Sequence, residues 1–316
     1  MIGILRVIQP GMLTTIQDRG RWGMQALGVP VAGPMDPCAH RAANAIVGNA
    51  AGAATLEVTL IGPELEFEDE RVVAVTGAVF QMTIDGRPAP HATAFMVSAG
   101  ARLCFGSRVR GTRAYIGIAG GVAVEPALGS RATHLISRMG GLGGRQLKAG
   151  DHLPLGDRMT SRPLANRLLA APTPLPEGHA VLRVLPGPQA EYFAGDALDT
   201  LQSASYTVGG KSDRMGFRLE GPVLRHAHGA DVISDATPLG VLQVPASGQP
   251  ILLMADRQTA GGYPKLATVI SADISTAGQL APGDTISFVV CAMREAMAAL
   301  IAQEQLLMAI EAHSGS

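Results

Sequence analysis

Lysine is nearly missing from this chain of 316 residues: only Lys148, Lys211 and Lys265 of its 25 basic residues are lysines. Arginine serves as the ordinary surface cation, so a lysine is less apt to be surface filler. An ammonium group is a compact charge whose pKa can be tuned, whereas a guanidinium stays charged. Lys211 and Lys265 both stand in polar loops that contain glycine, which makes them candidate functional residues. A skewed genomic base composition is the alternative explanation for the shortage.

Aromatic side chains and net charge are scarce as well. Aromatic residues make up 4% of the chain, the formal net charge is −1, and no basic block occurs. Nucleic-acid binding needs a cationic surface and, for single strands, rings on which bases can stack. These shortages argue against a nucleic-acid partner.

Cysteines and long apolar runs are also few. The three cysteines are far apart and odd in number, with no CxxC pair, which argues against a disulfide framework or a zinc site. The N-terminus does not have the layout of a signal peptide, and the apolar run at 289–293 is stopped by Arg294 and Glu295, short of membrane-spanning length. We therefore expect a cytoplasmic protein.

Glycine and proline are abundant instead, with 39 and 21 residues in turn-like contexts. Hydrophobic residues make up 47% of the chain and charged residues 16%, so well-buried cores are expected, and the frequent reversals predict a mainly β architecture. Asp85-Gly86 between two alternating segments predicts a hairpin. The predicted strands are Gly3–Ile8, Ala54–Thr59, Val72–Thr76, Val79–Ile84, Ala94–Val97, Arg102–Phe105, Arg113–Ile118, Leu182–Leu185, Ser205–Val208, Val241–Val244, Ile251–Met254, Leu266–Ile270 and Thr285–Val290.

Only two helices are predicted. Asp36–Val47 carries Asp36 as a plausible N-cap and Pro37 at the first helical position. Met293–Ile310 is rich in Ala, Met, Leu, Glu and Gln, a composition typical of an amphipathic helix.

The two halves of the chain echo each other faintly. Residues 146–153 and 279–286 each carry Gln-Leu, a turn with Gly-Asp and a final strand, and Asp18–Gly23 is loosely matched by Asp213–Gly216. Two copies of one β-barrel-like unit would explain both echoes. The predicted organisation is a first β domain at 1–160, a linker at 161–179, a second β domain at 180–292 and a helical tail at 293–316.

The most informative stretch is Met254–Lys265. Apolar runs lead into it and out of it, and between them stand Asp256, Arg257 and a Gly261-Gly262 pair. Polar groups at the mouth of rigid strands, beside glycines that allow close backbone approach, are typical of binding sites. An ordinary hairpin loop whose Asp and Arg pair with each other is the alternative.

Three other patterns suggest sites. Gly210-Lys211-Ser212 resembles part of a phosphate loop, but no helix start follows it, so ordinary turn chemistry or a lining role is favoured. His226 and His228 could share a metal ion, although no third ligand is evident and a solvated pair is favoured. Thr14–Gly23 is polar and includes the sole tryptophan, so it could form an anion- or amide-binding wall; an Asp18–Arg21 pair that clamps a loop is the alternative.

Many ordered motifs resemble one family, the biotin-dependent carboxyltransferase-like family, which is also known as allophanate hydrolase subunit 2 and includes the C subunit of 5-oxoprolinase. The resemblance covers roughly residues 3–290; it departs at Ala32-Gly33-Pro34, where Ser-Gly-Ala is more usual, and the tail after Met293 lies outside it. The matching motifs are Thr14–Asp18, Gly28–Pro30, Met35-Asp36, Gly62-Pro63, Thr76–Ala78, Arg113–Tyr115, Gly120-Gly121, Gly129–Thr133, Gly187–Gln189, Ser212–Gly216 and Asp256–Pro264.

The resemblance implies two tandem cyclophilin-like β-barrel domains with few helices. It also implies partners, namely a B subunit of 5-oxoprolinase, which resembles allophanate hydrolase subunit 1, and a LamB/YcsF-type A subunit. The first hypothesis is therefore the C subunit of a bacterial 5-oxoprolinase, which opens the 5-oxoproline lactam to L-glutamate with ATP held wholly or partly on partner subunits. The second is biotin-dependent carboxyl transfer, as in urea carboxylase. The third is a non-catalytic regulator that antagonises a kinase inhibitor.

Candidate site residues follow from the polar loops and the family motifs. Asp256 and Asp18 are candidates for proton transfer or orientation, and Lys265 for a catalytic cation directed into a cleft beside Arg214 and Arg257. Because like charges would crowd there, an anionic ligand or the carboxylates of Asp213 and Asp256 should neutralise them. The predicted substrate-binding residues are Gln17, Arg21, Ser212, Asp213, Arg214, Arg257, Gln258, Thr259, Gly261, Gly262 and Tyr263. No metal ligand is predicted.

Overall fold

The computed structural model describes residues 3–157 and 174–312. Contacts divide the chain into two compact units. The first unit comprises residues 1–21, 32–175 and 304–316, and the second comprises 22–31 and 176–303. The division after residue 175 falls inside the predicted linker at 161–179, most of which lies outside the described residues. The sequence did not suggest that residues 22–31 would belong to the second unit.

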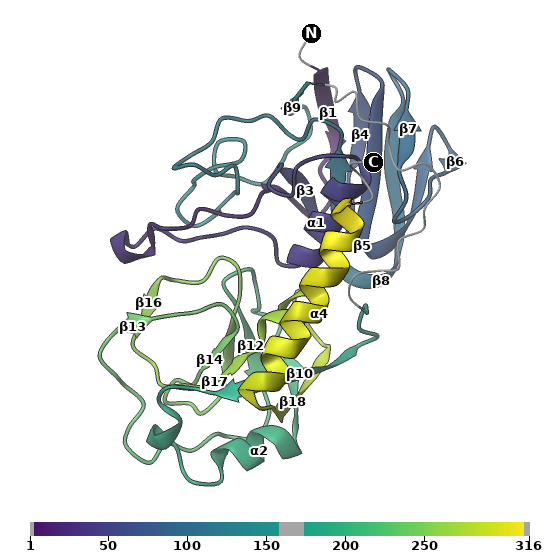
Figure 1. Cartoon of the computed structure of the whole chain (residues 1–316). Helices are drawn as coiled ribbons and strands as arrows, with labels where there is room; N and C mark the ends of the chain where they lie inside the picture. Colours follow the sequence, from purple (N-terminus) through teal and green to yellow (C-terminus); the bar gives the residue numbers. More distant parts are fainter. Residues whose placement is uncertain (1–2, 158–173, 313–316) are drawn as a thin grey trace. The chain divides into compact units, whose positions relative to one another are not determined.

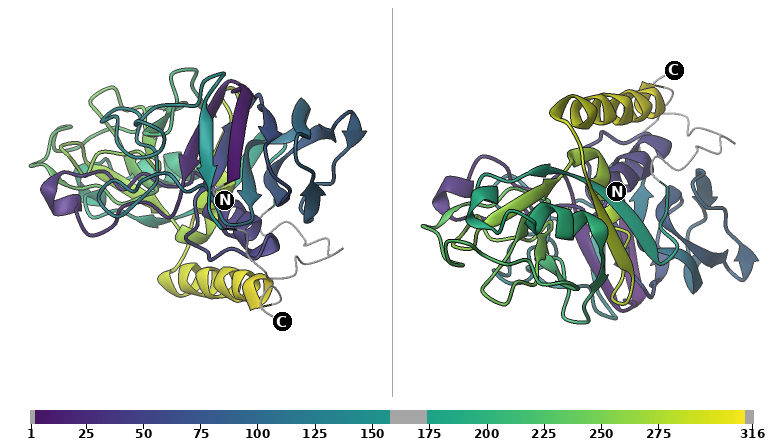
Figure 2. Two further views of the ribbon diagram at one scale, coloured as in Figure 1. Left: turned by 90° about the horizontal axis from the view of Figure 1, so that it is seen from above. Right: turned by 90° about the horizontal axis from the view of Figure 1, so that it is seen from below.

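The first unit is built on a nine-stranded antiparallel sheet with the order β2-β3-β8-β4-β1-β9, and β5 pairs with β6, β7 and β8. Its core is made by the inward residues of these strands, which are almost all fully buried. β1 and β9 are distant in sequence but lie side by side (Figure 2, left, purple and teal). The strands are β1 (Gly3–Gln9), β2 (Leu13–Gln17), β3 (Thr55–Thr59), β4 (Glu64–Phe67), β5 (Arg71–Ile84), β6 (Arg87–Pro88), β7 (Phe95–Val97), β8 (Arg102–Ile118) and β9 (His152–Leu155).

Two strands of this sheet are longer than the sequence predicted. β5 joins the predicted strands Val72–Thr76 and Val79–Ile84, and β8 joins Arg102–Phe105 and Arg113–Ile118 (Figure 1). The register between β5 and β8 shifts just after Gly77 and twice more before residue 82. The ladder therefore continues through bulges that interrupt the hydrophobic alternation.

The predicted turn and the first predicted helix are confirmed. Asp85 and Gly86 have φ values of 48° and 79°, as a two-residue hairpin loop requires, and they connect β5 to β6. Helix α1 (Pro37–Ile46) begins after Asp36, whose carboxylate accepts a hydrogen bond from the Ala39 amide. Gly117 lets α1 approach β8, because a Cβ there would lie 2.5 Å from the Ala43 carbonyl oxygen.

The second unit is a closed seven-stranded barrel with the order β10-β17-β14-β15-β12-β11-β18. β10 and β18 close it as a parallel pair, and the other neighbours are antiparallel. β13 and β16 form a separate two-stranded sheet. The strands are β10 (His179–Pro186), β11 (Ser205–Val208), β12 (Gly216–Glu220), β13 (Asp235–Ala236), β14 (Val241–Gln243), β15 (Ile251–Leu253), β16 (Ala260–Gly261), β17 (Lys265–Val269) and β18 (Thr285–Val290).

The structure contains two short helices that the sequence did not predict, α2 (Ala197–Ser203) and α3 (Ile274–Ala277). The predicted C-terminal helix is confirmed as α4 (Met293–Ala312). Its residues up to 303 belong to the second unit and those from 304 belong to the first. The mainly β architecture predicted from composition and from the family resemblance is confirmed, with one closed barrel and one nine-stranded sheet.

Candidate functional site

The outer face of the barrel carries a cavity of about 340 Å³, named here the barrel-face cavity. Across three adjacent strands, Arg218 on β12 faces Ile251 on β15, which faces Gln243 on β14. Their sequence neighbours Phe217 and Leu252 are buried in the barrel core, because alternate residues of a strand point to opposite faces. The lining residues are Lys211, Asp213, Met215, Gly216, Arg218, Gln243, Pro245, Ile251, Leu253, Gln258 and Tyr263.

Two of the predicted polar loops border this cavity. Asp213 and Met215 come from the loop between β11 and β12, and Gln258 and Tyr263 come from the connection between β15 and β17. The Gln258 side-chain amide donates to Oε1 of Gln243 at 3.1 Å. Nε2 of Gln243 in turn donates to the Tyr263 carbonyl at 3.4 Å. The cavity wall is therefore fixed by a chain of amide hydrogen bonds.

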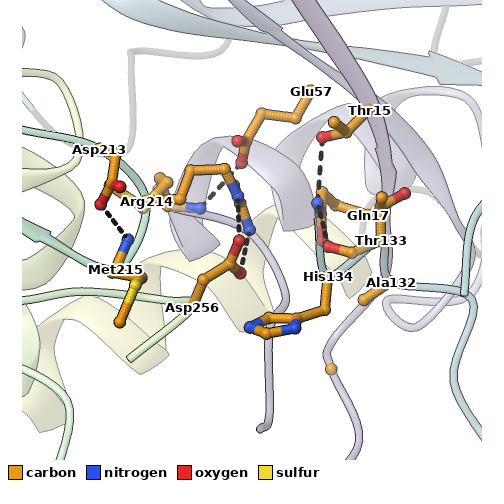
Figure 3. A network of polar contacts seen from close by, with 12 residues as sticks. Thr15, Gln17, Glu57, Ala132, Thr133, His134, Asp213, Arg214, Met215 and Asp256 are labelled. Atoms are coloured by element: carbon orange, nitrogen blue, oxygen red, sulfur yellow. Dashed lines mark hydrogen bonds and ion pairs between the residues drawn. The ribbon is translucent and has the colours of Figure 1, made fainter. Parts of the chain in front are cut away.

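A buried ion pair ties the two loops together. Arg214 and Asp256 form a bidentate pair, with Nε–Oδ2 and Nη2–Oδ1 distances of 3.0 and 2.9 Å (Figure 3). Their side chains are only 5% and 4% exposed, and the Asp256 amide also donates to the Arg214 carbonyl. Both carboxylate oxygens of Asp256 accept hydrogen bonds from the Arg214 guanidinium. This geometry suits a positioning role better than proton transfer.

Local hydrogen bonds shape the Ser212–Gly216 loop. Oδ1 of Asp213 accepts a hydrogen bond from the Met215 amide at 2.8 Å (Figure 3), and the Ser212 hydroxyl accepts one from the Arg218 amide at 3.0 Å. The Ser212 amide closes a turn on the Gly209 carbonyl. Strand β12 follows, not a helix, which agrees with the sequence argument against a phosphate loop.

Lys265 continues the same cross-strand row, since it faces Gln243 from β17. Its side chain is 1% exposed, and Nζ lies 3.0 Å from Oδ2 of Asp235 on β13. This hydrogen bond holds the pKa of the Asp235 carboxyl below its usual range. The prediction that Asp213 or Asp256 would neutralise Lys265 is wrong, because the partner is Asp235. Lys265 was predicted to point into a cleft, but it lines neither the barrel-face cavity nor the second cavity described next.

A second cavity of the same unit, of about 590 Å³, is named here the Arg257 cavity. Arg257 and Thr259 border it, while Gln258 between them lines both cavities. The predicted residues of this segment therefore serve two cavities and not one. The lining residues are Trp22, Gln25, Val31, Ala236, Thr237, Pro238, Leu239, Arg257, Gln258, Thr259 and Ser271.

The glycine pair of the 254–265 stretch has a packing role. A Cβ at Gly261 would lie 2.6 Å from Nε2 of Gln243, and one at Gly262 would lie 3.3 Å from the Val232 carbonyl oxygen. Gly261 thus leaves room for the amide that organises the barrel-face cavity.

Asp18 lies in the first unit and organises a neighbouring loop. Its Oδ1 accepts hydrogen bonds from the Gly20 amide at 2.9 Å and the Ser130 hydroxyl at 2.6 Å. Its Oδ2 accepts one from the Arg131 amide. With three donors on two oxygens, the carboxylate is a loop clamp in this structure.

Arg21 and Gln17 complete that clamp. Arg21 donates to the carbonyls of Ala127 at 3.2 Å and Ala132 at 2.6 Å, so the alternative of an Asp18–Arg21 pair does not apply. Gln17 is fully buried and donates to the Thr133 carbonyl at 3.1 Å (Figure 3). Neither residue lines the two barrel cavities.

The two histidines considered as metal ligands, His226 and His228, have structural contacts. His226 Nε2 lies 3.0 Å from the Val244 carbonyl oxygen, and its ring centroid lies 4.8 Å from that of Phe193. His228 packs edge-on near Tyr192. Within the described residues no group of three or more His, Cys, Asp or Glu side chains could hold a metal ion.

The family model for the carboxyltransferase domain, subdomain A and B, matches residues 27–290. The chain belongs to this carboxyltransferase family. The match confirms the family predicted from the motifs, and it includes the whole barrel of the second unit.

Two bacterial relatives within this carboxyltransferase family match the chain over nearly its whole length. The chain is 38% identical over 300 residues to the C subunit of 5-oxoprolinase from Escherichia coli, and the match covers 94% of each protein. It is 38% identical over 282 residues to the protein of the same name from Haemophilus influenzae, with 89% of each covered.

Larger relatives contain the carboxyltransferase region as one part. The chain is 33% identical over 302 residues to urea amidolyase of Saccharomyces cerevisiae, which covers 90% of this chain but 16% of that protein. The crystal structure of the K. lactis urea amidolyase matches with a TM-score of 0.92 and 32% identity, over 98% of this chain and 20% of that one.

One buried polar cluster of the first unit escaped the sequence analysis. Glu57, 1% exposed, accepts hydrogen bonds from the Tyr115 hydroxyl at 2.7 Å and the Met35 amide at 2.9 Å. Burial, followed by the Glu57 charge, raises the pKa of Tyr115 well above its ordinary value. The available signal was a glutamate inside an otherwise strand-like run at 54–59, because a charge there must be paired if both faces of the strand are buried.

In the part of the chain that the structure describes, none of the helices has both the length and the apolar character needed to cross a membrane.

Proposed function

We propose that this chain is the C subunit of a bacterial ATP-dependent 5-oxoprolinase and acts in a hydrolase complex that opens 5-oxoproline to L-glutamate. The proposal is carried by the share of each relative's length that this chain matches. The match spans 94% of both this chain and the C subunit of 5-oxoprolinase from Escherichia coli, whereas it spans only 16% of the yeast urea amidolyase. The identity to the C subunit of 5-oxoprolinase is also the higher of the two, at 38% against 33%.

The reaction needs an activated amide, because a five-membered lactam is stabilised by resonance. Transfer of a phosphoryl group from ATP to the lactam oxygen makes the carbonyl carbon electrophilic. Water then adds to that carbon, the C–N bond breaks, and the nitrogen takes up a proton to become the amine of glutamate. A second water hydrolyses the resulting acyl phosphate. The complex must therefore hold one substrate carboxylate and the negative charge that develops on oxygen.

The barrel cavities supply groups for this task. Arg214 and Lys265 are neutralised by carboxylates of the same unit, so we assign them to holding the loops and not to binding anions. Arg218 and Lys211 are exposed and border the barrel-face cavity, where they can attract an anionic substrate or intermediate. Arg257 borders the second cavity. Asp256 orients Arg214 in this scheme, and Asp18 keeps its loop in place.

ATP binding is assigned to partner subunits. The single phosphate-loop-like motif, Gly210-Lys211-Ser212, precedes a strand and not a helix, so it lacks the helix N-terminus that receives phosphate in such loops. We assign the ATP site to a B subunit that resembles allophanate hydrolase subunit 1 or to a LamB/YcsF-type A subunit, and we assign this chain to a complex with both.

Reconstitution tests the proposal. The purified chain is combined with candidate A and B subunits, 5-oxoproline and ATP, and glutamate is measured over time. Glutamate release that requires ATP and all three proteins is expected. Full release after this chain is omitted would refute the proposal.

Biotin-dependent carboxyl transfer is the second candidate. It is favoured by 32% identity and a TM-score of 0.92 to the K. lactis urea amidolyase over 98% of this chain. Under this alternative the barrel cavities receive carboxybiotin from a carrier supplied by another protein. Carboxyl transfer from carboxybiotin to urea in the absence of the A and B subunits would support this candidate over the first.

A further inference from the structure

The Arg257 cavity contains a buried positive charge that forms no ion pair with the described residues. Arg257 is 8% exposed and lines the cavity. Its Nε donates to the Thr237 carbonyl at 2.8 Å, and within residues 3–157 and 174–312 the Arg257 side chain makes no other hydrogen bond and no ion pair. A guanidinium has five N–H donors, so the four on the two Nη atoms remain for a ligand. Burial lowers the pKa of Arg257.

This arrangement contrasts with the other buried cations of the barrel. Arg214 is paired with Asp256, and Lys265 is paired with Asp235. A buried charge is normally paired because desolvation without compensation is costly. The missing counter-charge at Arg257 therefore points to an anion that binds from the cavity.

The walls beside Arg257 are held in place before any ligand arrives. The Thr237 amide donates to the Thr259 carbonyl at 3.1 Å, and the Thr237 hydroxyl donates to the Gln258 carbonyl. Together with the bond from Arg257 to Thr237, these contacts join the two segments that carry the lining residues. A guanidinium held in one orientation loses little entropy on binding an anion.

The remaining lining favours a small carboxylate over a phosphate. Trp22, Val31, Pro238 and Leu239 give the cavity apolar walls, and Arg257 is the one charged side chain among its lining residues. One positive charge balances a monoanion, whereas phosphoryl groups carry more charge and generally require several cations. A volume of about 590 Å³ is in the range of small-molecule sites.

We propose that the Arg257 cavity binds a small organic carboxylate, whose two oxygens accept hydrogen bonds from the Nη groups of Arg257 while its apolar part packs beside Trp22. That the ligand is a small carboxylate is inferred from the cavity alone. That this carboxylate is 5-oxoproline rests on the proposed function.

Trp22 provides a direct probe, because it is the single tryptophan of the chain and lines the cavity. The isolated chain is titrated with L-5-oxoproline, with 2-pyrrolidinone, which is the same lactam without the carboxylate, and with inorganic phosphate. Fluorescence is followed, and calorimetry checks each titration. Saturable binding of 5-oxoproline is expected, with both other compounds at least about tenfold weaker.

Variants separate the guanidinium from general effects. Arg257→Gln should weaken 5-oxoproline at least about tenfold, and Arg257→Lys, which keeps the charge but not the fork, should also weaken it. Arg225→Gln is the matched control, because Arg225 is an exposed loop residue of the same unit, is paired with Asp196 and lines neither cavity. If Arg257→Gln has an altered circular dichroism spectrum, the affinity of Arg257→Lys for 5-oxoproline is compared with that of the original protein instead.

The outcomes are distinct. Equal affinity for 5-oxoproline and 2-pyrrolidinone, tighter binding of phosphate, no binding of 5-oxoproline, or full affinity in both Arg257 variants would overturn the carboxylate site. Binding that depends on Arg257, in a chain whose reconstituted complex releases no glutamate, would keep the site and refute the proposed activity. Turnover with an unchanged KM in Arg257→Gln would keep the activity and remove the site.

Discussion

The buried imidazole of His40 makes the stability of the first unit dependent on pH. His40 is 1% exposed on α1, and burial lowers its pKa to about 4. Nδ1 lies 2.9 Å from the Thr55 hydroxyl, which itself donates to the Gln17 carbonyl, and Nε2 faces the Asn44 amide nitrogen at 3.5 Å. Thr55 therefore accepts from Nδ1–H, and Nε2 faces the Asn44 amide. The cost of burying the charged ring outweighs the opposing effects of the Asp18 and Glu57 charges and of a backbone hydrogen bond with Ala51. The folded protein holds the neutral imidazole.

The size of the effect on the free energy of unfolding follows from the difference between the folded and unfolded pKa values of His40. The ordinary histidine pKa of about 6.5 applies to the unfolded chain, and the folded value is about 4. As the pH falls below 6.5 the unfolded state takes up the proton first, so the contribution of His40 to the free energy of unfolding is complete above that pH and is lost towards pH 4. The expected loss is about 2 kcal/mol between pH 7.5 and pH 5, and about 3 kcal/mol by pH 4.

The assay compares the protein with His40→Gln, which keeps a neutral polar side chain but cannot titrate. Urea unfolding is followed by circular dichroism at intervals from pH 7.5 to pH 5, and the imidazole C2–H resonance is titrated by NMR. The difference in unfolding free energy between the two proteins should shrink by about 2 kcal/mol towards pH 5. His228→Gln, an exposed position, should keep the original slope. A folded His40 pKa of 6 or above, or an unchanged slope in His40→Gln, would refute the reasoning.

Two further substitutions test the packing of the second unit. Asp256→Asn removes one partner of a buried ion pair and should lower the free energy of unfolding by about 3–5 kcal/mol, whereas Asp213→Asn at an exposed position should cost about 0.5 kcal/mol or less. Equal costs in urea unfolding would contradict the burial argument. Gly187→Ala would place a Cβ 2.2 Å from the Lys265 carbonyl oxygen and should cost about 1–3 kcal/mol, while Gly195→Ala, with open space around it, should melt close to the original temperature.

Many strands could be predicted from the sequence because the alternation of apolar and polar residues is a local property. Ser205–Val208 and Thr285–Val290 form strands with the predicted bounds. The sequence could not predict that the short strands merge into β5 and β8. Bulges break the hydrophobic alternation there, while pairing with the neighbouring strand keeps the backbone extended. The helices α2 and α3 have seven and four residues, too few to show a helical period.

The sequence identified the charged residues of the candidate site but not the ion pairs that they form. The sequence singled out Arg214, Asp256 and Lys265 as charged groups in polar loops. It could not assign Lys265 to Asp235, because that contact depends on β13 and β16, which are two residues each and carry no pattern. The absence of a counter-charge at Arg257 is likewise a three-dimensional property, since Asp256 is adjacent in sequence yet turns to Arg214.

The position of Gln258 has a consequence for how this barrel can vary. One residue forms part of the wall of both cavities, and its side chain also fixes Gln243. A substitution there changes two linings at once, so no mutant of Gln258 can report on one cavity alone. For the same reason, a homologue that acquires a new ligand in either cavity through this position must accept an altered neighbour, and the ligand preferences of the two cavities are inherited together at that site.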